Sequence, residues 1–310
     1  MKQVRTVFMG TPKIAKTLLE NILQAGISID LVVTQPDRKV GRKQQVVYSP
    51  VKECALDNAI PVFQPQKIKE DFDPILKIQP DLIITCAYGQ IVPEEVLNAP
   101  RFGCVNLHGS LLPKYRGAAP IQRAVWNQDK ESGMSLMKMV SEMDAGPVFS
   151  EERILLDEEE TTSSLFDKMA DAASRLLIRD FDKICREDAS YTEQDKTLVT
   201  YAKKISKDDE RIDLSRSDQE IFAQIRALSL EPGGYVFIKK RKFKILEAHY
   251  HDHSISKPLS FLGKYKNGYG LALHNGVLEI VRCQMEGKPV VSGSDFANGQ
   301  GRSLIDMTCE

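Results

Sequence analysis

The chain has 310 residues, of which 42% are hydrophobic and 27% charged, and its formal net charge is −1 at pH 7. This length favours two domains, each able to bury a core. The balanced charge does not mark a nucleic-acid or membrane protein as a whole, so any surface for a polyanion must be local.

The cysteines and the apolar runs limit the class further. The six cysteines are scattered and form no CxxC pair. This predicts reduced, buried thiols in the cytoplasm rather than a metal finger or a disulfide framework. No stretch approaches the roughly 18 apolar residues of a membrane span, and the first residues read as a strand rather than a signal peptide.

Short apolar runs alternate with helical patterns in the first part of the chain. We expect strands over residues 4–10, 27–35, 61–65, 81–88 and 103–109, and helices over 11–26, 50–58 and 68–79. Thr11 is the expected N-cap of the first helix, and Gly26 its C-terminal stop. This alternation predicts a doubly wound, mostly parallel, Rossmann-like α/β domain.

The pattern changes after Gly133. Two strands are expected over 133–140 and 146–156, and a long amphipathic helix over 163–185. We therefore place a catalytic domain at 1–189, a linker at 190–206 and a second domain at 207–310. The second domain has a helical pattern near 218–227 and β-runs at 234–248 and 269–283, which predict a small, OB-like β-barrel.

Asn106 and His108 lie two residues apart on one strand, so their side chains face the same side. They come at the carboxyl end of the strand, where open α/β sheets bind ligands. Asp144 follows in a turn, where it can orient an imidazole or accept a proton. The alternatives are a hydrogen-bonded core histidine and an aspartate that only shapes its turn. Together the three groups suit attack of an external nucleophile on a carbonyl; a thiol nucleophile at Cys104 is a weaker alternative.

The motif VNLHGSLLPKYRGAAPIQ, with the later MDAGP, resembles the folate-dependent formyltransferases. Three more segments, FMGTP, VVTQPDRKVGR and LVTYAKKISKDDERIDLS, resemble the members of that family that act on methionyl-tRNA. The resemblance covers nearly the whole chain. It implies formyl transfer from 10-formyltetrahydrofolate to the α-amine of methionine on initiator Met-tRNA, without a metal, and Asn106, His108 and Asp144 as the catalytic residues. The implied folate-binding residues are Ser110, Leu111, Leu112 and Pro113, with Tyr88, Gln90, Ile91 and Val92 as a second wall.

Two basic stretches are candidates for tRNA binding. The resemblance implies that the long loop 34–50 lies against the acceptor end, with Arg42 the leading candidate beside Arg38 and Lys43. In the second domain, Lys239, Lys240 and Arg241 begin the basic run KKRKFK. A solvated loop and a charged hairpin that protects a sheet edge are the respective alternatives.

Other readings stay open. His249, His251 and His253 stand at strand spacing, but without a second ligand cluster an exposed loop is favoured over a metal site. Glycinamide ribonucleotide as the acceptor, or hydrolysis of the formyl folate, would use the same core motif. A non-catalytic RNA-binding protein would leave the Asn–His–Asp set unexplained. We expect a cytoplasmic monomer.

Overall fold

The structure is a computed structural model that describes residues 4–40, 44–186 and 189–310. The chain forms two compact units. Unit 1 comprises Met1–Pro120, Glu131–Ile154 and Phe166–Ala202, and unit 2 comprises Ile121–Lys130, Leu155–Leu165 and Lys203–Glu310. Two short stretches of the predicted catalytic domain therefore belong to unit 2, and most of the predicted linker belongs to unit 1.

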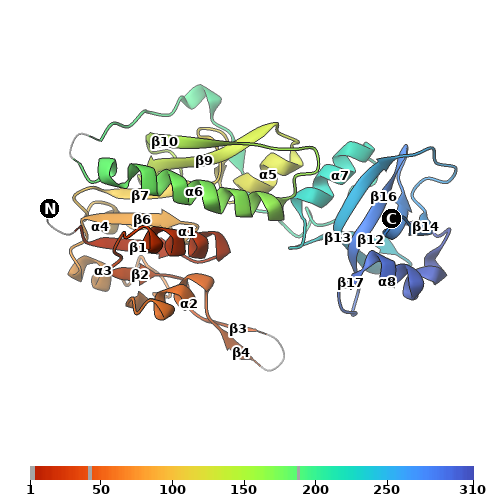
Figure 1. The fold of residues 1–310 in the computed structure, drawn as a ribbon, viewed down its shortest axis with the longest axis horizontal. Coiled ribbons are helices and arrows are strands. Elements are labelled where there is room, and N and C mark those ends of the chain that lie inside the picture. Colours follow the sequence, from red (N-terminus) through yellow and green to blue (C-terminus); the bar gives the residue numbers. More distant parts are fainter. Residues whose placement is uncertain (1–3, 41–43, 187–188) are drawn as a thin grey trace. The chain divides into compact units, whose positions relative to one another are not determined.

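Unit 1 is built on a seven-stranded sheet in the order β10-β9-β7-β6-β1-β2-β5 (Figure 1). Five neighbouring strands, β5, β2, β1, β6 and β7, run parallel, and β9 is antiparallel to β7. This confirms the predicted parallel α/β domain. The strands are β1 (Thr6–Gly10), β2 (Leu31–Val33), β5 (Val62–Phe63), β6 (Leu82–Cys86), β7 (Cys104–His108), β9 (Glu131–Lys138) and β10 (Val148–Leu155).

Helices cover this sheet because its central strands are apolar on both faces. All five residues of β1 are buried, and so are all five of β6. Within unit 1, α1 lies beside α6, and the amide of Asn21 donates a 2.9 Å hydrogen bond to the hydroxyl of Ser174 (Figure 1). The helices of unit 1 are α1 (Lys13–Gln24), α2 (Pro50–Asp57), α3 (Asp73–Lys77), α4 (Glu94–Leu97) and most of α6 (Thr162–Ile184), whereas α5 (Pro120–Trp126) belongs to unit 2 except for its first residue.

The ends of α1 differ in how well the sequence predicts them. Gly26 has φ of +85° and its N–H donates to the carbonyl of Leu23, so it stops the helix as expected. The predicted N-cap at Thr11 is wrong, because Pro12 holds that position. The hydroxyl of Thr11 donates instead to the carbonyl of Tyr88, 3.0 Å away, and thus joins the loops that follow β1 and β6.

The basic loop that follows β2 contains a two-stranded hairpin. Its strands are β3 (Arg38–Val40) and β4 (Gln45–Val47), which pair antiparallel (Figure 1). Val46 and Val47 are about half exposed, so this hairpin is not held by burial of its own side chains in unit 1. The sequence predicts only a loop here, since no core pattern marks the strands.

Unit 2 joins an antiparallel sheet to helix α7 (Asp218–Ala227). Ser217 and Glu220 form a capping box at the start of α7, which explains the match to the predicted helix. The sheet order is β12-β13-β16-β15-β14, with β17 beside β16. The remaining elements of this unit are β12 (Gly234–Ile238), β13 (Arg241–Asp252), β14 (Phe261–Tyr265), β15 (Gly268–Ala272), β16 (Gly276–Met285), β17 (Val291–Ser292), α8 (Gly293–Asn298) and the 3₁₀ helix Gln300–Leu304.

The two edge strands of this sheet do not pair with each other in the described residues, so a closed barrel is not found. The C-terminal segment bridges part of the distance between them. Glu310 exchanges two backbone hydrogen bonds with Phe237 of β12, and Phe261 of β14 donates to Met307. Phe243, Phe261, Tyr269 and Phe296 pack as an aromatic cluster in the core. Unit 2 is thus an antiparallel sheet domain, and the OB-like barrel stays a prediction.

Across the described residues of both units, we find no helix with the length and apolar character needed to span a bilayer.

Candidate active site

Strand β7 places Asn106 and His108 at the carboxyl edge of the parallel sheet. Asn106 lies beside Thr85 of β6 and Met137 of β9, and His108 lies opposite Ser135. The histidine is buried and the asparagine half-buried. Among the described residues, the side chain of Asn106 has no hydrogen-bond partner. A half-buried amide without a partner can donate to a ligand at little cost, because no internal bond has to break.

The structure brings His108 and Asp144 together. Nδ1 of His108 lies 3.6 Å from Oδ1 of Asp144, and its Nε2 lies 2.9 Å from the carbonyl oxygen of Tyr115. Because that oxygen can only accept, Nε2 carries a hydrogen. The other carboxylate oxygen of Asp144 accepts a 2.8 Å bond from the N–H of Gly117. The imidazole is therefore fixed between an anion and a carbonyl, an arrangement able to bind or move a proton.

Strand β9 holds the segment 110–113, which is predicted to bind folate, through the hydroxyl of Ser135. The hydroxyl of Ser135 accepts from the N–H of Leu112 at 3.0 Å and lies 2.7 Å from the carbonyl of Ser110. The side chains of Ser110 and Leu112 are buried, whereas Leu111 and Pro113 are partly exposed. Leu111 and Pro113 are thus the members of this segment that can touch a ligand.

The second predicted wall follows β6, so it leaves the same edge of the sheet as segment 110–113. Ile91 is 64% exposed, while Tyr88 and Val92 are buried. The amide of Gln90 is used within the protein: its oxygen accepts from the N–H of Ile68 at 2.8 Å. Ile91 is therefore the apolar side chain of this wall that a ligand can cover.

Two buried hydroxyls near this edge have no partner among the described residues: those of Thr85 and Tyr88. Burial raises the pKa of Tyr88 to about 12, so its hydroxyl stays protonated and able to donate. Thr85 lies next to Asn106 on the same face of the sheet. Buried polar groups are normally hydrogen-bonded, so these two indicate a place where a polar ligand or water binds.

Cys104 is not an active nucleophile. Its side chain is 1% exposed in the core of unit 1. Burial raises the pKa of its thiol to about 12, which leaves almost no thiolate at neutral pH. The thiol alternative is thus excluded, and a nucleophile from outside the protein is left.

The chain is similar to known proteins over nearly its whole length. The family model described as formyl transferase matches residues 3–181, and the model of the formyl transferase C-terminal domain matches residues 204–301. The methionyl-tRNA formyltransferase of Lactobacillus delbrueckii subsp. bulgaricus is 41% identical over 301 residues, which cover 96% of each chain. That of Malacoplasma penetrans is 38% identical over 308 residues, or 99% of this chain and 97% of the relative.

This chain belongs to the methionyl-tRNA formyltransferase family.

Solved structures of lower identity share the fold. An N-formyltransferase from Helicobacter canadensis, in complex with folinic acid and dTDP-3-aminofucose, has a TM-score of 0.67 at 19% identity and covers 89% of this chain and 99% of its own. HypX from Aquifex aeolicus, in complex with tetrahydrofolic acid, has a TM-score of 0.70 at 15% identity and covers 96% of this chain and 47% of its own. At these identities the likeness concerns the fold alone.

The structure describes only some of the basic residues that the methionyl-tRNA formyltransferase motifs suggest for tRNA binding. Arg38 is exposed on β3, whereas Arg42 and Lys43 lie outside the described residues. Lys239 and Lys240 form the two-residue turn between β12 and β13, and both are exposed. Arg241 follows them and donates to the carbonyl of Glu286 at 3.0 Å.

The three histidines of HYHDH share no carboxylate partner among the described residues of this methionyl-tRNA formyltransferase family member. Nδ1 of His249 lies 2.9 Å from Glu159, and Nε2 of His251 lies 2.8 Å from Glu279. His251 and His253 both lie near the ring of Tyr265. Two of the three thus form carboxylate pairs on different partners.

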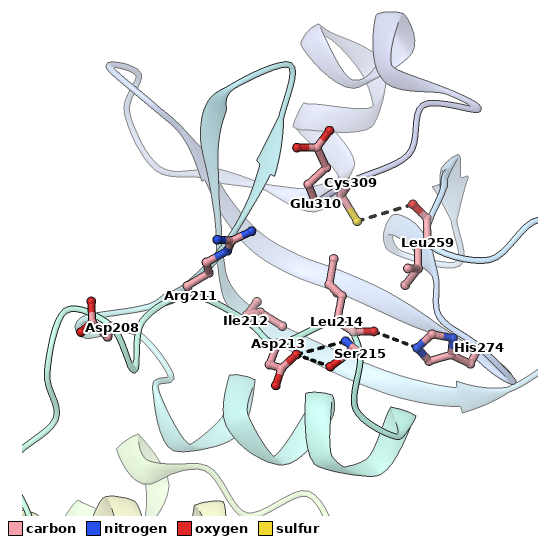
Figure 2. Close-up of a pocket in the computed structure, with 10 residues that line it drawn as sticks. All are labelled: Asp208, Arg211, Ile212, Asp213, Leu214, Ser215, Leu259, His274, Cys309 and Glu310. Carbon is pink, nitrogen blue, oxygen red and sulfur yellow. Dashed lines mark hydrogen bonds between the residues drawn. The ribbon is translucent and has the colours of Figure 1, made fainter.

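A hollow of about 610 Å³ lies in unit 2. Figure 2 draws the residues that line it. Leu214 and Leu259 give it an apolar side, and the carbonyl of Leu214 accepts a 2.9 Å bond from His274. None of its lining residues belongs to the predicted catalytic or folate-binding sets. The hollow therefore shares no lining residue with the site at Asn106, His108 and Asp144.

Sequence reasoning missed the residues that support Asp144, which are Arg116 and Gln194. Both side chains are buried, and they hydrogen-bond each other. Gln194 lies 50 residues from Asp144 in a stretch predicted as a linker, and an isolated glutamine carries no pattern. The Arg-Gly pair within the family motif is the one signal that pointed to this region.

Proposed function

We propose that the protein transfers the formyl group of 10-formyltetrahydrofolate to the α-amine of methionine on initiator Met-tRNA, for translation initiation. One observation carries the proposal: His108 is paired with Asp144 beside the unpartnered amide of Asn106, at the carboxyl edge of a formyltransferase sheet. The named relatives, about 40% identical over nearly the whole chain, support methionyl-tRNA as the acceptor.

Asn106 stabilises the oxygen that gains charge as the amine adds to the formyl carbon. Its amide donates to that oxygen without breaking an internal bond, because it has no partner among the residues that the structure describes. A donor fixed in place before reaction is worth more than a water molecule, since no reorganisation is needed. Removing one such donor typically costs about 10²–10³ in rate.

His108 moves the proton and supplies a second donor. Nε2 already carries a hydrogen toward the carbonyl of Tyr115, and it can exchange that carbonyl for the formyl oxygen. The other ring nitrogen, Nδ1, is the atom that can take the proton released by the amine, and Asp144, which faces it, stabilises the imidazolium that forms. The proton then passes to the folate nitrogen that leaves.

The residues around the trio suit a folate. Ile91 and Leu111 offer apolar surface to a flat ring system, and they leave the sheet from neighbouring parallel strands. The unpartnered hydroxyls of Thr85 and Tyr88 can hydrogen-bond the polar edge of such a ring. When bound, 10-formyltetrahydrofolate supplies the one-carbon unit that the amine attacks. By this scheme no metal is required.

Unit 2 binds the tRNA in this proposal, with Lys239 and Lys240 at the tip of the β12–β13 hairpin. Both have positive φ, 47° and 65°. A two-residue turn of this kind favours Asn-Gly, so lysine at both positions strains the backbone. The two lysines place their charges at the exposed tip of the hairpin, which supports a role in phosphate contact. Arg38, Arg42 and Lys43 of the long loop add contacts near the acceptor end, and Arg241 adds another in unit 2.

The proposal also includes domains at 1–189 and 207–310, an OB-like barrel in the second domain, and a cytoplasmic monomer. The six free cysteines suit the cytoplasm.

One assay tests the proposal. The protein is mixed with 10-formyltetrahydrofolate and, separately, Met-charged initiator tRNA, glycinamide ribonucleotide or water. We expect formyl-methionine in the tRNA reaction and slow loss of the folate in the other two. Rapid formylation of the nucleotide, or equal consumption of the folate in water, would overturn the assignment.

A further inference from the structure

Gln194 is bonded to both sides of the turn that carries Asp144. Its amide nitrogen donates to the carbonyl of Asp144 at 2.8 Å and to the carbonyl of Gly146 at 2.7 Å. Asp144 itself has φ of +52°, a conformation that few residues other than glycine adopt without cost. The two bonds therefore hold a strained turn in a single shape.

Arg116 fixes the other end of the same amide. Its Nε and Nη2 donate to Oε1 of Gln194 at 3.0 and 2.8 Å. Its chain neighbours reach the catalytic pair: the carbonyl of Tyr115 faces His108, and the N–H of Gly117 faces Asp144. One three-residue segment thus contacts the imidazole, the carboxylate and, through Gln194, the backbone of the turn.

A side-chain amide matches this arrangement. The carbonyls of Asp144 and Gly146 each need a hydrogen-bond donor, and the guanidinium of Arg116 needs an acceptor. The amide of Gln194 provides all three. Arg116 is 5% exposed and Gln194 9% exposed, so water cannot readily replace a lost bond. Position 146 admits no residue larger than glycine, since a Cβ there would collide with the carbonyl oxygen of Lys138.

We propose that Gln194, held by Arg116, is a positioning residue that keeps the carboxylate of Asp144 against His108 during formyl transfer. The inference rests on the proposed function. A residue that only stabilises the fold would lower activity by lowering the amount of folded protein. The positioning role of Gln194 instead requires a lower kcat for the protein that is folded. Misplacement of a reacting group by about 1 Å can cost on the order of 100-fold in rate.

Gln194→Glu tests this with the least change of shape. Glutamate keeps the acceptor for Arg116 but turns a carboxylate oxygen toward two carbonyls, which repel it. We expect kcat to fall about 10- to 100-fold while the KM for 10-formyltetrahydrofolate is unchanged. Arg116→Lys loosens the same amide from its other end and should lower kcat in the same direction if Gln194→Glu does not fold.

Gln224 offers a matched control in unit 2. Its amide nitrogen also donates to two carbonyls, of Asp209 at 3.0 Å and Arg211 at 2.8 Å, and its oxygen accepts from the N–H of Asp213. It is 4% exposed. Gln224→Glu should therefore cost a similar amount of unfolding free energy. We expect kcat at saturating substrates to stay near that of the unmodified protein.

A second readout needs no turnover. The ring resonances of His108 in an NMR spectrum, assigned with His108→Gln, should shift in Gln194→Glu and not in Gln224→Glu. If the unmodified protein forms no formyl-methionine, the proposed function fails, and the NMR comparison still tests the contact. Equal kcat losses in both glutamate variants, or an unshifted His108 ring in Gln194→Glu, would overturn the positioning role.

Discussion

Asp144 directs its two carboxylate oxygens at different parts of the site: Oδ2 accepts from the N–H of Gly117 at 2.8 Å, and Oδ1 lies 3.6 Å from Nδ1 of His108. The first contact sets the orientation of the carboxylate and the second acts on the imidazole. Because the two contacts use separate oxygens, a substitution of Asp144 can weaken the contact with His108 and keep the contact with Gly117.

Asp144→Asn should remove the charge that faces His108 while its amide oxygen still accepts from Gly117. We expect kcat to fall at least ~100-fold, because the imidazolium loses its counter-charge. Thermal unfolding should change little. Asp144→Ala, which loses both contacts, should be less stable and no more active; an active Asp144→Asn enzyme would contradict the role given to the carboxylate.

Asn106→Ala should lower kcat by about 10²–10³ without loss of stability, because its amide has no hydrogen-bond partner to lose in the described part of the chain. Asn58→Ala is the matched control. That amide donates to the carbonyl of Cys54 at 2.8 Å, far from the trio in sequence, so its loss should cost about 1 kcal/mol of unfolding free energy and leave kcat unchanged. Steady-state kinetics and urea unfolding of both variants check the pair; retained turnover in Asn106→Ala refutes the oxyanion role.

Asn-Gly in place of Lys239 and Lys240 should separate stability from tRNA binding in unit 2. The exchange relieves strain in the turn, so the unfolding free energy should rise or stay equal. It also removes two charges, so the slope of log affinity for Met-tRNA against log salt should shrink by about 1–2. Titrations at several salt concentrations measure this slope, and Lys67→Gln with Lys69→Gln is the charge-matched control on unit 1. An unchanged slope would place the tRNA elsewhere.

Asp180 should make the stability of unit 1 depend on pH. Its carboxylate is buried, which raises the pKa, but hydrogen bonds from Arg179, Ser150 and Lys183 outweigh burial and lower the pKa to about 2. The folded pKa lies below the ordinary value, so the stabilisation is complete at neutral pH and is lost as the pH falls from about 4 to 2. Because Arg179 and Lys183 are half-exposed, it amounts to no more than about 2 kcal/mol.

Asp180→Asn should therefore be less stable than the unmodified protein at pH 7, and the difference should shrink toward pH 3. Urea unfolding at both pH values measures it, with the exposed Asp71→Asn as a control. A difference that stays constant between pH 7 and pH 3 would show that charge is not its source.

The sequence predicts elements best where a local pattern is strong. Helix α7 matches its expected bounds because Ser217 and Glu220 form a capping box, and β6 and β7 match because they are continuous apolar runs. The hairpin β3–β4 was missed because its exposed residues carry no burial pattern. Thr11 was misplaced as an N-cap because its hydroxyl bonds a loop 77 residues away, which no local rule can foresee.

The sequence alone determined the parallel sheet, the family and the pairing of Asn106 with His108 on one strand face, because strand alternation is a property of the backbone. Only the tertiary structure decided that Asp144 faces His108, that Cys104 is core, and that Gln194 braces the Asp144 turn from a supposed linker. The contacts of Asp144 with His108 and with Gln194 join residues that are 36 and 50 positions apart. Their formation depends on how buried donors and acceptors find partners in the packed chain, which spacing along the sequence does not encode.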